Sequence, residues 1–177
     1  MNVTESDIGG LAQVLIDCVA GGASVSFMTP LSTERASDFW RTVAANVASG
    51  RRALLVAEDA GAIVGTVQLI LDLPENQPHR ADVSKMLVHR RARRRGVGAA
   101  LLLEIENLAR KLGRWLLVLD TASPEAARLY ERLGWMRVGS IPGFALLPDG
   151  GMCATTFFYR CLDSGSRAAT PPVTGQP

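Results

Sequence analysis

The sequence predicts a single-domain α/β fold with a mixed, mostly antiparallel sheet that is flanked by helices. At 177 residues, with 47% apolar residues and a net charge of +2, the chain has the composition of one globular domain with a substantial core. Apolar periodicity predicts the order helix, helix, three strands, helix, strand, helix and two strands. The helix between the third and fourth strands predicts one parallel crossover in an otherwise antiparallel sheet.

The folded domain is expected to span residues 1–162. Residues 163–177 are rich in Pro, Gly and Ser, a composition typical of a disordered tail. No apolar run reaches the roughly 18–20 residues that span a membrane, and the first residues lack a basic segment followed by an apolar stretch. We therefore expect a cytoplasmic protein with no membrane partner. The cysteines, Cys18, Cys153 and Cys161, lack metal-site spacing, so no metal is expected.

Two helices are predicted in the N-terminal part. Residues 5–20 carry apolar side chains at helical spacing, and Thr4 with Asp7 resembles a capping box at their start. Ser32 is the expected N-cap of a second helix that ends near Ser49. Few residues precede the first helix, so any strand before it is expected to be short or missing.

Strands and helices alternate in the rest of the chain. A hairpin signal, Asp59-Ala60-Gly61, joins the first two strands, and Pro124 begins the last helix at its first turn. The predicted helices cover residues 98–112 and 124–133. The predicted strands cover residues 53–58, 62–71, 80–88, 115–121, 135–146 and 152–162.

A basic, glycine-containing loop follows the third predicted strand. Five arginines lie within residues 90–95, and Gly96 and Gly98 open the next helix. The first N–H groups of a helix have no intrahelical partner and favour negative charge, so this loop is predicted to bind phosphate. Removing these five charges from a net of +2 leaves −3, which makes the positive charge local. With no aromatic residue between Met86 and Arg114 to stack on bases, no nucleic-acid partner is expected.

Two common phosphate-binding loops are excluded. A P-loop needs Gly-Lys followed by Ser or Thr, and no such triplet occurs. A dinucleotide fingerprint needs a third glycine three residues after Gly98, where Leu101 stands.

The remaining pattern, Arg93-x-x-Gly96-x-Gly98, resembles the cofactor loop of the GCN5-related N-acetyltransferases (GNATs). About thirty residues later, AARLYERLGWMRVG resembles the family's Ala-x-x-Leu-Tyr-x-x-x-Gly-Phe segment. The resemblance spans residues 50–147 and implies a GNAT-like sheet with one parallel, splayed strand pair around the cofactor. Segments such as GGASVSFM, VAED and KMLV are similar to the tabtoxin-resistance branch, which acetylates a dipeptide toxin that contains a β-lactam.

The resemblance implies acetyl-CoA as the donor. Its pyrophosphate would lie on the backbone N–H groups from Arg94 through Ala99, with Arg90 and Arg91 solvated or near the ribose phosphate. Arg93 would serve the cofactor or, alternatively, shape the loop through a salt bridge. Many relatives have Asn at the position of Ser123, which weakens that contact. The cofactor-binding residues expected in full are Met86, Leu87, Val88, Arg93, Arg94, Arg95, Gly96, Val97, Gly98, Ala99, Ser123 and Tyr130.

The reaction needs an acid and a base. Tyr130 matches the family tyrosine that protonates the departing thiolate, although a tyrosine at this helical spacing is otherwise a core aromatic. Asp82 and Asp120 are the candidate catalytic bases and substrate contacts. Period two would place Ser84, Met86 and Val88 on the face of Asp82. The alternatives are an ion pair of Asp82 with Arg80 or Lys85, and a helix cap or turn at Asp120. His79 and His89 are further possible bases.

These features predict acetyl transfer from acetyl-CoA to a small-molecule amine, a dipeptide or β-lactam-type toxin among them, through a ternary complex. Phe27 lies in a loop of small residues that suits a segment folding over the substrate, although a packed interhelix loop is equally consistent. The alternatives are acetylation of protein N-termini or lysines, and a non-catalytic acyl-CoA sensor. A homodimer is a further expectation, through Trp115 and the strand-rich C-terminal part.

Overall fold

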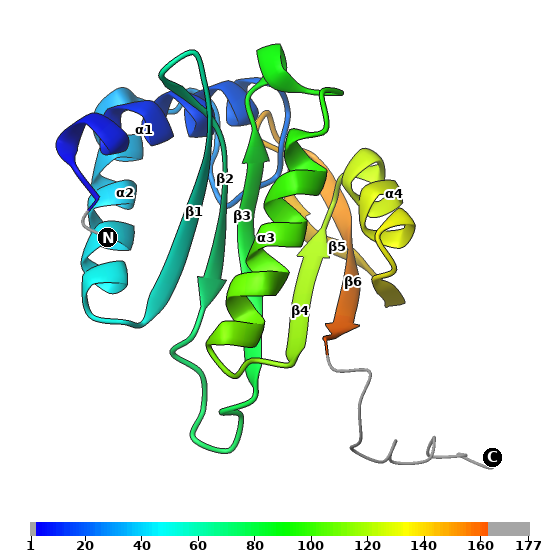
Figure 1. Ribbon diagram of the computed structural model, residues 1–177. Helices are drawn as coiled ribbons and strands as arrows, with labels where there is room; N and C mark the ends of the chain where they lie inside the picture. Colours follow the sequence, from blue (N-terminus) through cyan, green and yellow to red (C-terminus); the bar gives the residue numbers. More distant parts are fainter. Residues whose placement is uncertain (1–2, 163–177) are drawn as a thin grey trace.

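A computed structural model describes residues 3–162 of the chain and has the predicted order of elements (Figure 1). The helices are α1 (Glu5–Ala20), α2 (Thr33–Ala48), α3 (Val97–Lys111) and α4 (Pro124–Arg132), with a short 3-10 helix, η1 (Arg90–Ala92). The strands are β1 (Arg52–Asp59), β2 (Ala62–Ile70), β3 (Arg80–Val88), β4 (Leu116–Thr121), β5 (Met136–Leu146) and β6 (Met152–Cys161). Within this range no strand precedes α1, as expected. The predicted tail, residues 163–177, lies outside the described residues.

The six strands form one mixed sheet in the order β1-β2-β3-β4-β6-β5. Only β3 and β4 are parallel among the pairs of this sheet, which confirms the predicted crossover through α3. Their pairing covers Arg80–Asp82 against Leu116–Val118, while β3 continues to Val88 and β4 to Thr121. The two strands therefore part along their C-terminal halves, where neither supplies the other with backbone partners.

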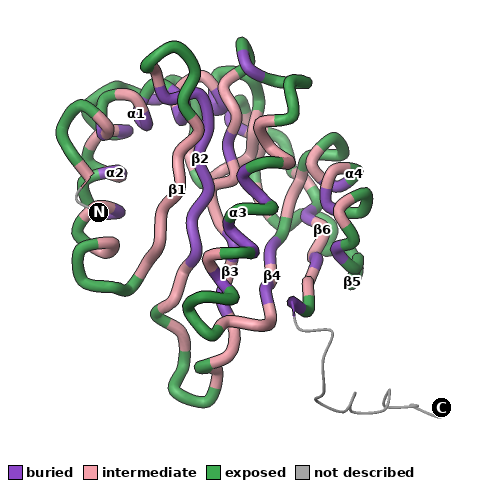
Figure 2. The backbone as a smooth tube through the Cα atoms, viewed as in Figure 1, coloured by how far each residue is buried: buried purple, intermediate pink, exposed green. Residues whose placement is uncertain are grey.

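Apolar side chains pack on both faces of the sheet. The α3 and α4 helices cover one face, where fully buried Leu102, Ile105 and Leu117 form the centre of the larger core. The α1 and α2 helices cover the other face around the fully buried Trp40. Buried segments accordingly run through the central strands, whereas β5 at the edge is exposed along nearly its whole length (Figure 2). The region where β3 and β4 separate therefore lies between the two helical layers.

The helix starts follow the capping chemistry seen in the sequence. The Thr4 backbone N–H donates to Asp7 Oδ2 at 2.8 Å, and the Asp7 backbone N–H donates to Thr4 Oγ1 at 3.2 Å, which completes the capping box. Ser32 caps α2 by accepting from the Arg35 backbone N–H at 3.2 Å. Aspartate thus serves as well as glutamate in the box.

One expectation about β3 is wrong. Thr66 pairs with Leu87 and Gln68 with Ser84, so β3 has three residue steps where β2 has two. This bulge is at Lys85, whose φ is +49°. It reverses the alternation of side chains, so Met86 and Val88 pack on the α3 side and not on the face of Asp82.

Candidate functional site

A cavity of about 1030 Å³ occupies the parting of β3 and β4 and extends to the α1–α2 loop and the N-termini of α3 and α4. Of the site residues predicted from sequence, Asp82 and Arg95 do not line it. All the others do: Phe27, Met86, Leu87, Val88, Arg93, Arg94, Gly96, Val97, Gly98, Ala99, Asp120, Ser123 and Tyr130. The structure therefore brings residues from five separate segments of the chain to one hollow.

The start of α3 forms the anion-binding end of the cavity. Gly96 is the N-cap with a φ of +83°, and no side chain caps the helix. The N–H groups of the first turn have no intrahelical partner, and the residues that carry them, Val97, Gly98 and Ala99, line the cavity. Arg94 lies beside them with a φ of +61°. A free helix N-terminus next to a guanidinium group has the chemistry to hold a diphosphate.

Three arginines of this loop are fixed by contacts within the protein. Arg93 Nε donates to the carbonyl oxygen of Val88 at 3.2 Å, so Arg93 shapes the loop through the backbone and not through a salt bridge. Arg95 Nη1 pairs with Asp59 Oδ2 at 2.8 Å, which directs its side chain away from the cavity. The Arg95 side chain therefore lies outside the cavity lining.

Arg90 is tied to α1. Its backbone N–H and its Nε donate to the two carboxylate oxygens of Asp17, at 2.7 Å and 2.9 Å. The Arg90 side chain is nevertheless 54% exposed, so its expected position in solvent or near a ribose phosphate stays a prediction. Burial acts to raise the pKa of Asp17, but the two hydrogen bonds from Arg90 and the charges of His89 and Arg90 together lower it below its usual value. Asp17 thus anchors the basic loop.

Met86 and Val88 line the middle of the cavity below α3. A Cβ atom added to Gly98 would lie 3.8 Å from Met86 Sδ and from Val88 Cγ2. Leu87, between them, packs into the opposite core with α1 and α2. Beyond the pairing with β4, this edge of β3 offers the backbone groups that an extended ligand would use.

Tyr130 of α4 is both a core aromatic residue and a residue that lines the cavity. Its ring is 4% exposed and packs 5.6 Å from the ring of Phe158 and 5.9 Å from that of Trp135. It also lines the cavity. Burial, with a smaller effect of the Asp120 charge, raises the pKa of Tyr130 well above its usual value. Such a phenol stays protonated and can donate.

The two aspartates have different environments. Asp120, at the end of β4, lines the cavity, and its Oδ2 accepts from Thr155 Oγ1 at 2.6 Å. Asp82 pairs with Arg80 at 3.2 Å, the alternative noted in the sequence, and its buried Oδ1 has no partner within the described residues. Burial raises the pKa of Asp82, the Arg80 charge lowers it and the Asp120 charge raises it, with a net upward result. Asp120 alone of the two reaches the cavity.

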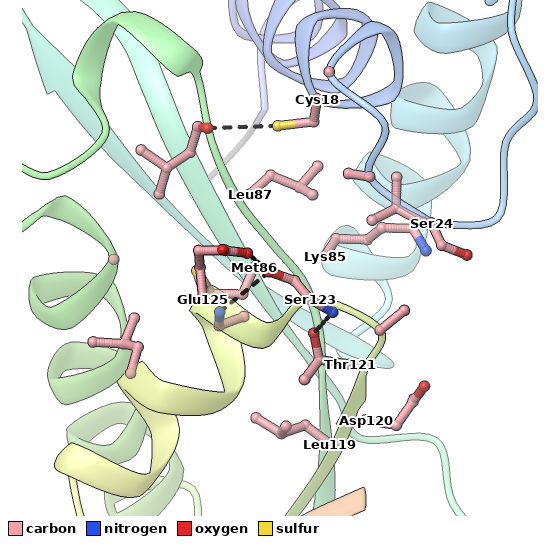
Figure 3. A pocket seen from close by; sticks show the side chains of 18 of the residues that line it. Cys18, Ser24, Lys85, Met86, Leu87, Leu119, Asp120, Thr121, Ser123 and Glu125 are labelled. Carbon is pink, nitrogen blue, oxygen red and sulfur yellow. Dashed lines mark hydrogen bonds between the residues drawn. The ribbon is translucent and has the colours of Figure 1, made fainter. Parts of the chain in front are cut away.

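Ser123 has a structural task at the start of α4. Its Oγ accepts from the Ala126 backbone N–H at 3.2 Å and donates to Glu125 at 3.1 Å, and its own N–H donates to Thr121 Oγ1 at 3.0 Å (Figure 3). The hydroxyl of Ser123 is therefore engaged by the helix cap.

The end of the cavity that is lined by the α1–α2 loop contains contacts that the sequence did not reveal. Ser24 Oγ donates to the carbonyl oxygen of Leu146 at 2.9 Å, and the Thr29 backbone N–H donates to that of Pro148 at 2.9 Å. The α1–α2 loop is thus joined to the β5–β6 connection across the hollow. Only the small residues of this loop and Phe27 hinted at such a covering segment, and Phe27 is 5.2 Å from Phe39, ring to ring.

Lys85 is a charged cavity residue that the sequence analysis did not place in the site. Its Nζ donates to Ser26 Oγ at 3.2 Å and lies 5.7 Å from the ring of Phe39. The available signal was its rarity, because it is one of two lysines beside seventeen arginines.

Two further features of residues 3–162 bear on function. None of their helices combines the length and the apolar content that crossing a membrane requires. Nor do these residues contain a group of three or more His, Cys, Asp or Glu side chains that could hold a metal ion.

Solved structures share this fold over nearly the whole chain. Ribosomal-protein-alanine N-acetyltransferase from Brucella melitensis matches with a TM-score of 0.77 and 23% identity, covering 91% of this chain and 98% of that one. A GCN5-related N-acetyltransferase from Kribbella flavida matches with a TM-score of 0.74 and 24% identity, covering 91% and 95%. A phosphinothricin acetyltransferase from Sinorhizobium meliloti, solved in complex with AcCoA, matches with a TM-score of 0.76 and 21% identity, covering 97% and 92%.

The family comparison supplies what fold similarity alone does not. Residues 50–137 match the model of the acetyltransferase (GNAT) domain, a segment that contains the basic loop, the parting strands and Tyr130. The chain therefore belongs to the GNAT superfamily of acetyltransferases.

Proposed function

We propose that this protein is an acetyl-CoA-dependent N-acetyltransferase that acetylates a small-molecule amine by direct transfer in a ternary complex. Membership of the GNAT superfamily supports the reaction class, and a related fold has been solved with AcCoA bound. The cavity supports the arrangement, since it joins an anion-binding helix start to a carboxylate and a phenol through the parting of two strands.

The donor would occupy the α3 side of the cavity. Its diphosphate would accept hydrogen bonds from the N–H groups of the α3 first turn, with Arg94 adding charge. The pantetheine arm would run along Met86–Val88, where β3 has parted from β4 and has backbone groups to offer. This path would bring the thioester to Tyr130.

The observation that favours a small acceptor is the closure of the acceptor end. Hydrogen bonds from Ser24 and Thr29 join the α1–α2 loop to the β5–β6 connection, so this end is bounded on two sides. A protein terminus or a lysine on a folded protein would need a groove open along its length. A compact amine needs none.

In the proposed reaction the neutral amine nitrogen attacks the thioester carbonyl carbon. A C–N bond forms, the C–S bond breaks, and the nitrogen loses a proton. Asp120, directly or through water, takes the proton from the amine, and Tyr130 gives its proton to the departing sulfur. Backbone N–H groups near Leu87 and Val88 would stabilise the oxyanion. The products are the N-acetyl amine and free CoA.

Further proposals concern the identity of the acceptor and the oligomeric state. A phosphinothricin acetyltransferase among the similar folds supports an amino-acid-like or dipeptide toxin, tabtoxin included, as the acceptor. A homodimer would use β5, an edge strand with exposed Val138 (68%) and Phe144 (50%). The expected cytoplasmic location stays a prediction.

Thiol release tests the proposed function. Purified protein is mixed with acetyl-CoA and a panel of amines that includes dipeptides, phosphinothricin, a lysine peptide and a protein N-terminal peptide. Turnover of a small amine at least tenfold faster, in kcat/KM, than of either peptide supports the proposal. Preference for the peptides would assign a protein acceptor, and acetyl-CoA binding without any turnover would make the protein a sensor.

A further inference from the structure

Lys85 is an unneutralised cation on the acceptor side of the cavity. It belongs to the short set of charged residues that line the hollow, and it forms no ion pair within residues 3–162. Its one hydrogen bond is to Ser26 Oγ, at 3.2 Å. In Figure 3 its side chain runs from the strand toward the α1–α2 loop, on the side of Ser24.

The backbone conformation makes this placement specific. Lys85 has a φ of +49° at the β3 bulge, a region that favours glycine and costs a lysine free energy. The bulge also turns the side chain toward α2, where Nζ lies 5.7 Å from the Phe39 ring. A strained lysine in a cavity is consistent with a role for the amino group itself.

The surroundings of Lys85 favour an anion. Arg52, whose Nη1 donates to Gln68 Oε1 at 2.8 Å, also has no carboxylate partner in the described chain. Burial lowers the pKa of the Lys85 ammonium, the Arg52 charge lowers it further, and Asp120 raises it. Of the carboxylates nearby, Asp82 is paired with Arg80, while Asp120 accepts from Thr155 and forms no ion pair with Lys85 within the described residues. A ligand carboxylate would supply the missing negative charge.

We propose that Lys85 binds a carboxylate of the acceptor, so that this enzyme selects amines that carry a carboxylate, with the amine at Asp120 and the carboxylate at Lys85. The inference rests on the proposed function and names its substrate class. Two opposite charges that line one cavity match a zwitterion and discriminate against a simple alkylamine, whose single charge would leave Lys85 unpaired.

Matched acceptors test the proposal. Amino acids and dipeptides are compared with their C-terminal carboxamides, which keep the amine and remove the negative charge. We expect the wild type to favour the free carboxylate by about tenfold or more in kcat/KM. Lys85→Met should abolish this preference by raising KM for the carboxylate alone, while Lys85→Arg retains it. Equal use of both forms by the wild type, or an intact preference in Lys85→Met, would overturn the proposal.

Two control variants test whether Lys85 binds the acceptor carboxylate or only holds the α1–α2 loop through Ser26. Ser26→Ala removes the hydrogen bond of Lys85 but keeps its charge, so the carboxylate preference should persist; its loss would indicate a tether. Lys111→Met removes the other lysine, which is exposed at the end of α3, and should leave the preference unchanged.

Chemical labelling provides a readout that does not depend on turnover. Reductive methylation with mass spectrometry reports both lysines, and Lys111 serves as the internal reference. With CoA present, millimolar dipeptides should protect Lys85 at least tenfold more than their carboxamides. Turnover only of amines without carboxylates would leave the proposed function standing and overturn this assignment, as would equal protection by the two forms.

Discussion

At the scale of single residues, the local environment distinguishes candidate acid and base residues that the sequence alone could not rank. The Asp120 charge acts to raise the pKa of both Asp82 and Tyr130, yet of these three residues only Asp120 and Tyr130 line the cavity. Their roles follow from what each can still do: a protonated phenol can donate, and an accessible carboxylate can accept. Asp82, held by Arg80, is better suited to positioning.

Tyr130→Phe tests the acid. The substitution removes only a hydroxyl and keeps the ring that packs against Trp135 and Phe158, so folding and acetyl-CoA affinity should be unchanged. Loss of general acid catalysis should lower kcat by about 100- to 1,000-fold. Because the pKa of Tyr130 is raised, the wild-type rate should not fall between about pH 7 and 9 through its ionisation. A kcat within a few-fold of the wild type would show that another group protonates the sulfur.

Asp120→Asn and Asp82→Asn form a matched pair. Asp120→Asn should lower kcat/KM by about 100-fold, since it removes the proposed proton acceptor from the cavity. Asp82→Asn keeps the shape of a side chain that lies outside the cavity lining and should cost only a few-fold. Steady-state kinetics at saturating acetyl-CoA compare them, and the reverse ranking would assign the base to Asp82.

At the scale of elements, the basic loop owes its position to α1 as much as to α3. Asp17 accepts from the backbone N–H and from Nε of Arg90, and its carboxylate is only 11% exposed. Asp17→Asn should therefore destabilise the protein by about 1–2 kcal/mol at pH 7 and weaken acetyl-CoA binding.

The pH dependence of that effect has a definite sign. The pKa of Asp17 is lowered in the folded state, so its stabilisation is complete above the unfolded value near 3.8 and is lost as pH falls through the folded value. Denaturant melts should show the two proteins converging below about pH 4. A difference that grows on acidification would contradict the anchoring role.

Gly65 permits the contact between β2 and α3. A Cβ atom there would lie 3.1 Å from Leu101 Cδ1, from Val97 Cγ1 and from the carbonyl oxygen of Leu87. Gly65→Ala should thus cost about 1–3 kcal/mol in the free energy of unfolding. Gly9→Ala, in α1 with open space around it, is the control and should stabilise by about 0.5–1 kcal/mol. Equal effects at both positions in thermal melts would refute the packing argument.

The elements themselves were largely predictable, because caps, glycines and apolar periods are local. The Thr4–Asp7 box, the Ser32 cap and the parallel crossover all appear where the sequence predicted them. The bulge at Lys85 was not predictable, since it depends on the register of β3 against β2 and has no glycine to mark it. Because of that bulge, the prediction that Met86 lies on the same face of β3 as Asp82 was wrong.

The pairing of charges was equally out of reach. The five arginines of residues 90–95 look alike in sequence, but Asp17 and Asp59, distant along the chain, each engage one of them. Side chains brought together by tertiary contacts leave no periodic signal. The same holds for the closure of the acceptor end by Ser24 and Thr29.

At the scale of the whole molecule, helices cover both faces of a sheet whose parallel pair ends early, and the cavity there connects the proposed anion site to the proposed acid and base. In the proposed arrangement the donor contacts are mostly backbone groups, whereas the acceptor contacts are side chains. Donor specificity should consequently survive many substitutions that alter the acceptor.

Calorimetric titration of acetyl-CoA tests the central claim most directly. Acetyl-CoA should bind at one site per chain with a Kd on the order of 1–100 μM. S-acetylpantetheine, which keeps the thioester but lacks the diphosphate, should bind about 100-fold more weakly, because the α3 N-terminus then has no anion to hold. The absence of acetyl-CoA binding at about 1 mM, well above that expected Kd, or equal affinity for the two compounds, would contradict the account.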